Sequence, residues 1–200
     1  MRDMWAILLA AGQSTRMGSL KALLPWNGST LVEYQVKTLL AAGVSSVIVV
    51  VGHRPPDITK VVVDIPKVMV VLNENYKNGK TTSIKTGLRH IPTSASDILI
   101  LSVDQPRSES VVGSLIQAHI ENHSLITGPY YSGHMGHPLI FSGDLLEELL
   151  SIREELQGIR DITERHRDSI HLVETNDHSV MTDLNYPMDV EIAQGTNIDG

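Results

Sequence analysis

Residues 8–21 read Leu8-Leu9-Ala10-Ala11-Gly12-Gln13-Ser14-Thr15-Arg16-Met17-Gly18-Ser19-Leu20-Lys21. The run from Trp5 to Ala10 is apolar throughout, as expected of a strand that is buried on both faces. Small residues follow it, so backbone N–H groups can approach a ligand closely, and the segment then adds hydroxyl groups and the cations of Arg16 and Lys21. A buried strand that leads into such a loop predicts an α/β protein with a polyphosphate site.

Two familiar phosphate loops do not match this segment. A Walker loop has Lys directly after its second Gly, but here Ser19 follows Gly18, and the interval from Gly12 to Gly18 is too long. The Gly-x-Gly-x-x-Gly fingerprint of dinucleotide-binding proteins is absent from the sequence. The remaining alternative is a turn of small residues that carries incidental surface cations.

Apolar runs recur along the chain and alternate with segments of helical period, which is typical of a parallel sheet covered by helices. The predicted strands are Trp5 to Ala10, Val47 to Val51, Val68 to Leu72, Ile98 to Val103 and Leu125 to Thr127, with further candidates at Leu139 to Phe141, Ile170 to Val173 and Val180 to Leu184. In open α/β sheets the ligand binds beyond the carboxyl ends of the strands. We therefore expect the chemistry in the loops after the first, third and fourth runs.

Apolar positions at helical spacing predict four helices. The first lies between Thr30 and Gly43, because Thr30 and Glu33 have capping-box spacing and Gly43 fits a left-handed stop. The others run through Ile84 to Ile91, Val112 to Ile120, and Leu145 to Leu150. We expect one domain over residues 1–194 and a flexible tail over residues 195–200.

The composition excludes several classes of protein. The chain of 200 residues is 42% hydrophobic and 20% charged, which is too apolar for a disordered protein. It has no Cys, which rules out disulfides and cysteine nucleophiles and is compatible with a reducing cytoplasm, where we expect the protein. Its net charge of −7 and its short apolar runs predict neither nucleic-acid binding nor attachment to a membrane.

The nine His residues show no recognisable zinc pattern. His119 and His123 are at helical spacing, but Glu121 is misplaced for His-Glu-x-x-His and no third ligand is evident. We expect His119, His123, His166, His171 and His178 at the surface or at helix ends.

The phosphate-loop segment is one of five that together resemble a known family. The pattern of residues 9–21 is similar to the opening signature of the MobA-like nucleotidyltransferases, and most of all to their molybdopterin cytidylyltransferase branch, which includes accessory proteins of xanthine dehydrogenase-type enzymes. The other four segments occur in the family's order: Asn75 to Leu88, Ser102 to Pro106, Gly136 to Pro138 and Thr182 to Asp189. The resemblance implies a Rossmann-like nucleotidyltransferase fold, with three α/β/α layers and a mostly parallel mixed sheet.

The resemblance also implies an activity. Members of the branch transfer CMP from CTP to the terminal phosphate of molybdopterin, release pyrophosphate and use Mg²⁺ as cofactor. A molybdenum-dependent oxidoreductase of the xanthine dehydrogenase type is the implied protein partner. The preference for CTP rests on the sequence Ala10-Ala11-Gly12, since the guanylyl-transferring branch usually has Ala-Gly-Gly there.

The family's functional positions imply a role for each matching residue. The implied nucleotide contacts are Ala10, Ala11, Gly12, Ser14, Arg16, Lys21, Gly79, Lys80 and Ser83. The implied acceptor contacts are Gly136, His137 and Arg160, and the implied metal ligands are Asp104 and Asn185, with Asp183 as a substitute for Asn185. Arg16, Lys21 and Asp104 are the expected catalytic residues.

The chemistry of such a transfer agrees with these residue types. A phosphate monoester has a second pKa of ~6, so the attacking oxygen is largely ionised at neutral pH and needs no general base. The barrier is electrostatic, because one anion must approach another, and catalysis consists mainly of neutralising charge and aligning the reactants. Arg16 is suited to bidentate phosphate contact and Lys21 to acting as a movable point charge.

Two departures from the family leave the acceptor open. Asn185 stands where the family usually has Asp, and an amide oxygen brings no charge to a metal. Residues 155–160 keep Gly158 and Arg160 but lack the family's Gly-Asp pair. The alternatives are a cytidylyltransferase for another small phosphorylated acceptor, such as methylerythritol phosphate or a sugar phosphate, and a non-catalytic carrier of the molybdenum cofactor.

Structural roles are also open for several site residues. Asp104 fits the N-cap of a helix that begins near Ser108, and Gly79 fits a simple helix cap. Arg160 has charged neighbours that are typical of a solvated helix face. His137 fits a packed turn as well as it fits contact with the acceptor.

Overall fold

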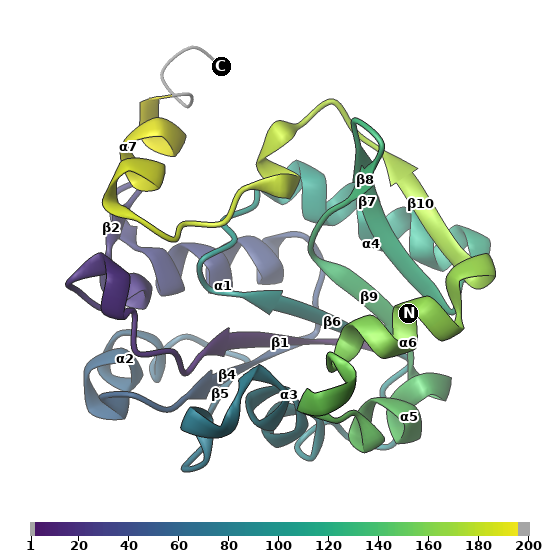
Figure 1. Ribbon diagram of the computed structural model, residues 1–200, viewed down its shortest axis with the longest axis horizontal. Helices are drawn as coiled ribbons and strands as arrows, with labels where there is room; N and C mark the ends of the chain where they lie inside the picture. Colours follow the sequence, from purple (N-terminus) through teal and green to yellow (C-terminus); the bar gives the residue numbers. More distant parts are fainter. Residues whose placement is uncertain (1–2, 196–200) are drawn as a thin grey trace.

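The computed structural model describes residues 3–195, and a mixed β-sheet runs through its centre (Figure 1). The strands lie in the order β10-β7-β9-β6-β1-β4-β5, and the short β8 pairs with β7. Their bounds are β1 Met4–Ala10, β4 Ser46–Val51, β5 Val68–Leu72, β6 Asp97–Ser102, β7 Ile126–Tyr131, β8 His134–Met135, β9 Leu139–Ser142 and β10 Ile170–Glu174. In this sheet β8 and β9 run antiparallel to their neighbours and the other pairs are parallel, as the resemblance implies. A separate hairpin pairs β2 Pro25–Trp26 with β3 Ser29–Thr30.

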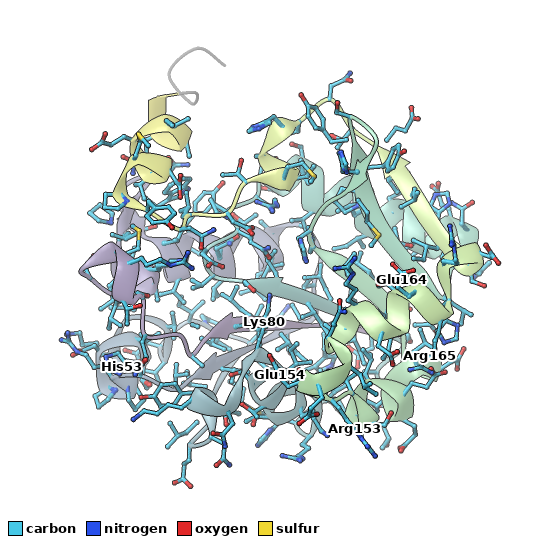
Figure 2. All side chains as sticks on the ribbon, viewed as in Figure 1. His53, Lys80, Arg153, Glu154, Glu164 and Arg165 are labelled. Atoms are coloured by element: carbon cyan, nitrogen blue, oxygen red, sulfur yellow. The ribbon has the colours of Figure 1, made fainter. Side chains whose placement is uncertain are left out.

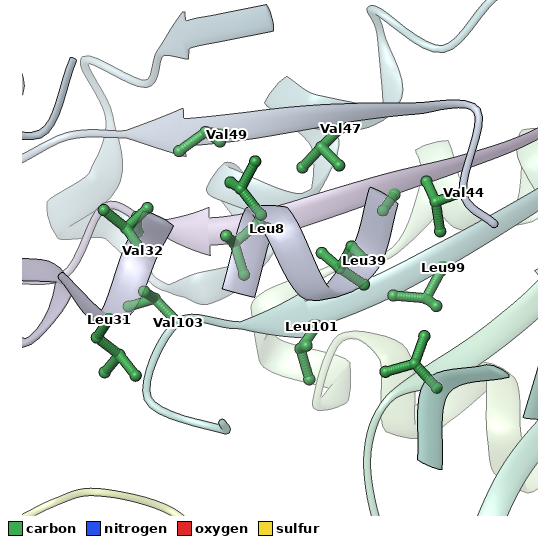
Figure 3. Close-up of a cluster of buried hydrophobic side chains, with 14 of the residues drawn as sticks. Leu8, Leu31, Val32, Leu39, Val44, Val47, Val49, Leu99, Leu101 and Val103 are labelled. Atoms are coloured by element: carbon green, nitrogen blue, oxygen red, sulfur yellow. The ribbon is translucent and has the colours of Figure 1, made fainter. Parts of the chain in front are cut away.

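Helices cover both faces of the sheet, which confirms the three layers. They are α1 Leu31–Ala41, α2 Pro55–Val62, α3 Lys80–Leu88, α4 Glu109–Asn122, α5 Leu146–Ser151, α6 Ile159–Arg165 and α7 Pro187–Gly195. Leu8 of β1 belongs to the apolar cluster beneath α1, α2 and α4, whereas Ile7 belongs to the cluster beneath α3, α5 and α6. Figure 3 shows the first cluster, with Leu8 between Leu39 of α1 and Val49 of β4. Strand β1 lacks polar alternation because both of its faces are buried.

The first helix confirms the capping box. The Thr30 hydroxyl accepts a hydrogen bond from the Glu33 N–H (3.4 Å), and the Glu33 carboxylate accepts one from the Thr30 N–H (3.2 Å). The helix ends at Ala41, and Gly43 follows with φ 104°, a left-handed conformation that Gly adopts without strain.

The candidate strand from Val180 to Leu184 is wrong. Residues His178–Met181 form a short 3-10 helix, and the segment after it is irregular. Val180 and Leu184 are fully buried, so their apolar character reflects core packing rather than membership of a sheet. The Val180 carbonyl accepts hydrogen bonds from Arg107 and from the His137 N–H instead of joining a ladder.

Other element boundaries also differ from those predicted. Helix α3 ends at Leu88, although Ile91 beyond it is still buried. Helices α2 and α7 were not predicted; α2 begins with two prolines after Arg54, which adopts a left-handed conformation. Gly195 is the last residue of α7, and residues 196–200 of the predicted tail lie outside the described residues.

His119 corrects the expectation of surface or helix-end histidines. Its side chain is fully buried, with Nε2 3.1 Å from an Asp97 carboxylate oxygen and Nδ1 2.8 Å from the Thr127 hydroxyl. It occupies the inner face of α4, four residues after Leu115, so helical spacing placed it in the core. The three polar groups are linked by these two hydrogen bonds where α4 packs on β6 and β7.

Within residues 3–195, no helix combines the length and the hydropathy that crossing a bilayer requires.

Candidate active site

The loop after β1 is closed on itself by Ser14. The Ser14 hydroxyl accepts a hydrogen bond from the Lys21 N–H (3.0 Å), and its carbonyl accepts one from the Met17 N–H (2.9 Å). Met17 and Leu20 are buried and anchor the loop to the body of the protein. This folding leaves the Arg16 side chain exposed while turning Lys21 back toward the strand ends.

Lys21 meets the end of a neighbouring strand. Because β1 and β6 are parallel, the loops after both strands lie at the same edge of the sheet, and Asp104 comes two residues after β6. The Lys21 ammonium lies 2.8 Å from an Asp104 carboxylate oxygen and donates to the Asn185 side-chain carbonyl at 3.2 Å. The cationic loop and the acid predicted from distant parts of the sequence therefore converge.

The segment before α7 presents Asn185 to this pair. The Asp189 carboxylate accepts hydrogen bonds from the N–H groups of Asn185 and Tyr186, both at 2.7 Å, and the Leu184 N–H donates to the Asp104 carbonyl at 2.8 Å. These bonds fix the backbone around Asn185. Asp183 is instead bound to Gln105, whose amide donates to its carboxylate at 2.8 Å.

Asp104 is not the N-cap of the following helix. Ser108 caps α4, since its hydroxyl accepts a hydrogen bond from the Val111 N–H (3.3 Å). The Asp104 side chain instead pairs with Lys21, and both residues line one cavity.

A cavity of about 580 Å³ opens beside these residues, beyond the carboxyl ends of β1 and β6. Its walls include all of the predicted nucleotide contacts: Ala10, Ala11, Gly12, Ser14, Arg16, Lys21, Gly79, Lys80 and Ser83. Sequence reasoning missed Tyr76 and Lys77, which also line it. Arg16 rests against Tyr186, with its guanidinium 5.3 Å from the ring centre, a distance typical of a cation–π contact.

The start of α3 separates this cavity from a second one. Gly79 has φ 107°, a conformation that L side chains rarely adopt, and it lies against the Glu154 carboxylate. That carboxylate accepts a hydrogen bond from the Thr81 N–H (2.8 Å), which together with the nearby Lys80 holds the pKa of Glu154 below its usual value. Figure 2 shows Lys80 and Glu154 side by side at this boundary.

The second cavity, of about 410 Å³, contains two of the predicted acceptor contacts. His137 and Arg160 line it, and Lys80 and Ser102 line both cavities. Gly136 is buried behind His137, with the Val180 carbonyl where a side chain would begin. The residues predicted to hold nucleotide and acceptor thus lie around two adjoining spaces.

His137 is a neutral group in this wall. Burial, together with the positive charges of Lys80 and Arg107, lowers its pKa from 6.5 to about 4. At neutral pH its imidazole therefore offers hydrogen bonds but no charge to an anionic ligand.

The lowered pKa of the partly buried His137 predicts a dependence of stability on pH. The unfolded chain binds a proton on this residue as the pH falls from about 6.5 toward 4, but the folded protein does not, so stability is lost as the pH falls through this range. The expected slope is about 1.4 kcal/mol per pH unit. Urea unfolding of the wild type and of His137→Asn between pH 4.5 and 7 measures it, and equal slopes for the two proteins would contradict a partly buried, neutral His137.

Sequence reasoning missed Arg107, which is 1% exposed. Its guanidinium donates hydrogen bonds to the carbonyl oxygens of Pro106, His137, Val180 and Thr182 at 2.7 to 3.1 Å. Burial lowers its pKa to about 10, so it stays charged at neutral pH. Arg107 thus links the backbone at His137 to the backbone at residues 180–182, which precede Asn185 in the chain. No residue spacing in the sequence indicates this link.

An open α/β sheet whose carboxyl-end loops surround such a cavity is the architecture of an α/β protein that binds a ligand such as a nucleotide. Residues 6–170 match the family model of the MobA-like NTP transferase domain, and the chain belongs to this family.

Individual relatives carry different names. Nicotine blue oxidoreductase of Paenarthrobacter nicotinovorans is 29% identical over 187 residues, which are 89% of this chain and 90% of that protein. Molybdenum cofactor cytidylyltransferase of Escherichia coli (strain K12) is 28% identical over 149 residues, 72% of each chain. The crystal structure of Rv0371c from Mycobacterium tuberculosis H37Rv has a TM-score of 0.84 at 22% identity, over 97% of this chain and 98% of that one, a likeness of fold.

Proposed function

We propose that this protein transfers CMP from CTP to the terminal phosphate of a molybdopterin-type acceptor and releases pyrophosphate. The observation that carries the proposal is the convergence of Lys21, Asp104 and Asn185 beside a cavity that shares Lys80 and Ser102 with a second one. Two adjoining cavities suit a reaction that joins two phosphate-bearing molecules. The name of the Escherichia coli relative favours a molybdenum cofactor as acceptor and a cytidylyl group as the part transferred.

The pair Asp104 and Asn185 fits a divalent ion. Their side-chain oxygens already face one cation, the Lys21 ammonium, and oxygen is the ligand atom that Mg²⁺ prefers. Within residues 3–195 no three His, Cys, Asp or Glu side chains are grouped as metal ligands, which agrees with a site that nucleotide phosphates complete. Mg²⁺ held there would neutralise charge on the reacting phosphate.

The protein's own groups bind and orient the nucleotide. In the proposed complex the backbone at residues 10–12 and the start of α3 with Ser83 hold the nucleoside, and Arg16 and Lys21 hold the triphosphate. An acceptor phosphate oxygen then forms a bond to the α-phosphorus of CTP as the bond to the pyrophosphate oxygen breaks. Lys21 and Arg16 compensate the negative charge that moves onto the leaving pyrophosphate.

The acceptor would occupy the second cavity. Arg160 and Lys80 provide positive charge for its phosphate, and the neutral His137 provides a hydrogen bond. The product is a dinucleotide-like cofactor, which we expect to be delivered to an oxidoreductase of the xanthine dehydrogenase type.

Release of pyrophosphate tests the proposal. Purified protein is incubated with Mg²⁺ and molybdopterin, and with each of the four nucleoside triphosphates in turn. We expect release with CTP, formation of the cytidylylated cofactor, and no release when either the acceptor or the metal is left out.

Other outcomes favour other functions. Binding of molybdopterin without release of pyrophosphate indicates a carrier. Faster release with methylerythritol phosphate or a sugar phosphate indicates a different acceptor. Turnover of a redox dye without any nucleoside triphosphate would favour the kind of activity named for the Paenarthrobacter relative.

A further inference from the structure

One buried amide has a fixed orientation and contacts Ser83, which lines the cavity of about 580 Å³, here called the nucleotide cavity. Asn73 follows β5 and is 3% exposed. Its side-chain carbonyl accepts a hydrogen bond from the Asn75 N–H (3.0 Å), a group that can only donate. The oxygen of the amide is therefore identified by its partner, and the NH₂ group must face the other way.

The NH₂ group of Asn73 donates both of its hydrogens to hydroxyl groups at the start of α3. It lies 2.9 Å from the Thr82 hydroxyl and 2.9 Å from the Ser83 hydroxyl. Both hydroxyl oxygens must act as acceptors in these bonds, so each must direct its own hydrogen elsewhere.

The two hydroxyls differ in where that hydrogen can go. The Thr82 hydroxyl has two backbone acceptors, the carbonyls of Gly79 (2.9 Å) and Asn75 (3.0 Å). For the Ser83 hydroxyl no acceptor is found among residues 3–195, although its side chain is buried and lines the nucleotide cavity. Its hydrogen is left to be donated to a ligand, because a buried hydroxyl without an acceptor is costly.

We propose that Asn73 fixes the Ser83 hydroxyl as a hydrogen-bond donor toward the nucleobase, and thereby selects a base whose ring nitrogen is unprotonated. Cytosine has a lone pair on N3 that can accept a hydrogen bond from the Ser83 hydroxyl. Uracil carries a hydrogen on N3, so its N3–H and the Ser83 hydroxyl would both be donors. The inference rests on the proposed function, in which Ser83 contacts the base. It makes Asn73 a positioning residue that acts through Ser83.

The variant Asn73→Asp reverses the direction of the hydrogen bond between residue 73 and the Ser83 hydroxyl. An ionised carboxylate accepts but cannot donate, so the Ser83 hydroxyl turns its hydrogen toward residue 73 and offers only lone pairs to the cavity. We expect the affinity for CTP relative to that for UTP to fall at least about tenfold, the factor typical of one mispaired hydrogen bond. Calorimetric binding of each nucleotide at pH 8, with no acceptor present, measures the ratio without turnover.

Two further variants show whether the effect passes through Ser83. Thr82→Val removes the other hydroxyl that Asn73 contacts, outside the lining of the cavity, and is expected to leave the ratio unchanged. In a Ser83→Ala background, Asn73→Asp is expected to have no effect on the ratio. The proposal is overturned if folded Asn73→Asp keeps the wild-type ratio, or if its effect persists without Ser83.

Thermal unfolding reports whether Asn73→Asp folds. If it does not fold, the single variants Ser83→Ala and Thr82→Val decide. A ratio of CTP affinity to UTP affinity that falls in Ser83→Ala but not in Thr82→Val supports the action of Asn73 through Ser83. Wild-type ratios in both variants overturn it. Failure of the wild type to bind any nucleoside triphosphate refutes the proposed function, and the inference fails with it. If the wild type binds nucleotides but no variant changes the ratio of the CTP affinity to the UTP affinity, the inference is refuted and the proposed function is not.

Discussion

Asp104→Ala is expected to lower the turnover number at least about a hundredfold while leaving the protein folded. The Asp104 carboxylate accepts a hydrogen bond from the Lys21 ammonium, which also donates to Asn185, and it lines the nucleotide cavity. The substitution removes the negative charge that would hold a divalent ion. The Asp104 side chain is 27% exposed, and Asn185 remains a partner for the Lys21 ammonium, so thermal unfolding is expected to change little. Release of pyrophosphate at saturating CTP measures the loss.

Metal dependence separates this role from a general loss of charge. Asn185→Asp adds a carboxylate beside Asp104, and we expect it to lower the Mg²⁺ concentration needed for half-maximal turnover. Asp64→Ala removes an exposed carboxylate on a surface turn and serves as the matched control. A turnover number for Asp104→Ala within tenfold of the wild type would contradict the role assigned to Asp104.

Lys21→Ala is expected to lower turnover by at least a comparable factor, about a hundredfold, for a different reason. Lys21 is proposed to neutralise the triphosphate and the leaving pyrophosphate, and its ammonium is largely shielded from water, with 12% of the side chain exposed. Charge interactions are stronger in such a site than at the surface. The affinity for CTP is expected to fall together with the turnover number.

The same variant is expected to bind metal more tightly when no nucleotide is present. The Lys21 ammonium occupies the space between the oxygens of Asp104 and Asn185, so a divalent ion must displace it. Titration with Mn²⁺, followed by electron paramagnetic resonance, measures this binding without turnover. Lys37→Ala, at an exposed helix position, is the control, and a Lys21→Ala protein with normal turnover would refute the proposal.

The sequence predicted most of the sheet because apolar runs are a local property. Strands β1, β4 and β6 are buried on both faces, and their aliphatic residues record this directly. The same rule failed for residues 180–184, since burial alone does not distinguish a strand from a loop packed into the core. It also missed α2, where a left-handed Arg54 and two prolines begin a short helix.

The sequence indicated which residues belong to the site but not how all of their side chains are placed. Motif residues such as Lys21 and Asp104 could be found in the sequence, but Asn185 and Asp183 were both candidates for the same position. The Asn185 backbone N–H donates to Asp189, which leaves the Asn185 side chain to Lys21, whereas the Asp183 carboxylate is bound to the Gln105 amide. Such bonds depend on which groups the folded chain brings together.

By itself the sequence determined the α/β class, the loop of small residues after the first strand and the types of group available for chemistry, because periodicity and local composition carry this information along the chain. The tertiary structure alone decided that Asn185 meets Lys21, that Arg107 is buried, and that Asn73 orients the Ser83 hydroxyl. These features join residues far apart in the chain or depend on the direction of single hydrogen bonds. Only the packing of the folded chain fixes such directions.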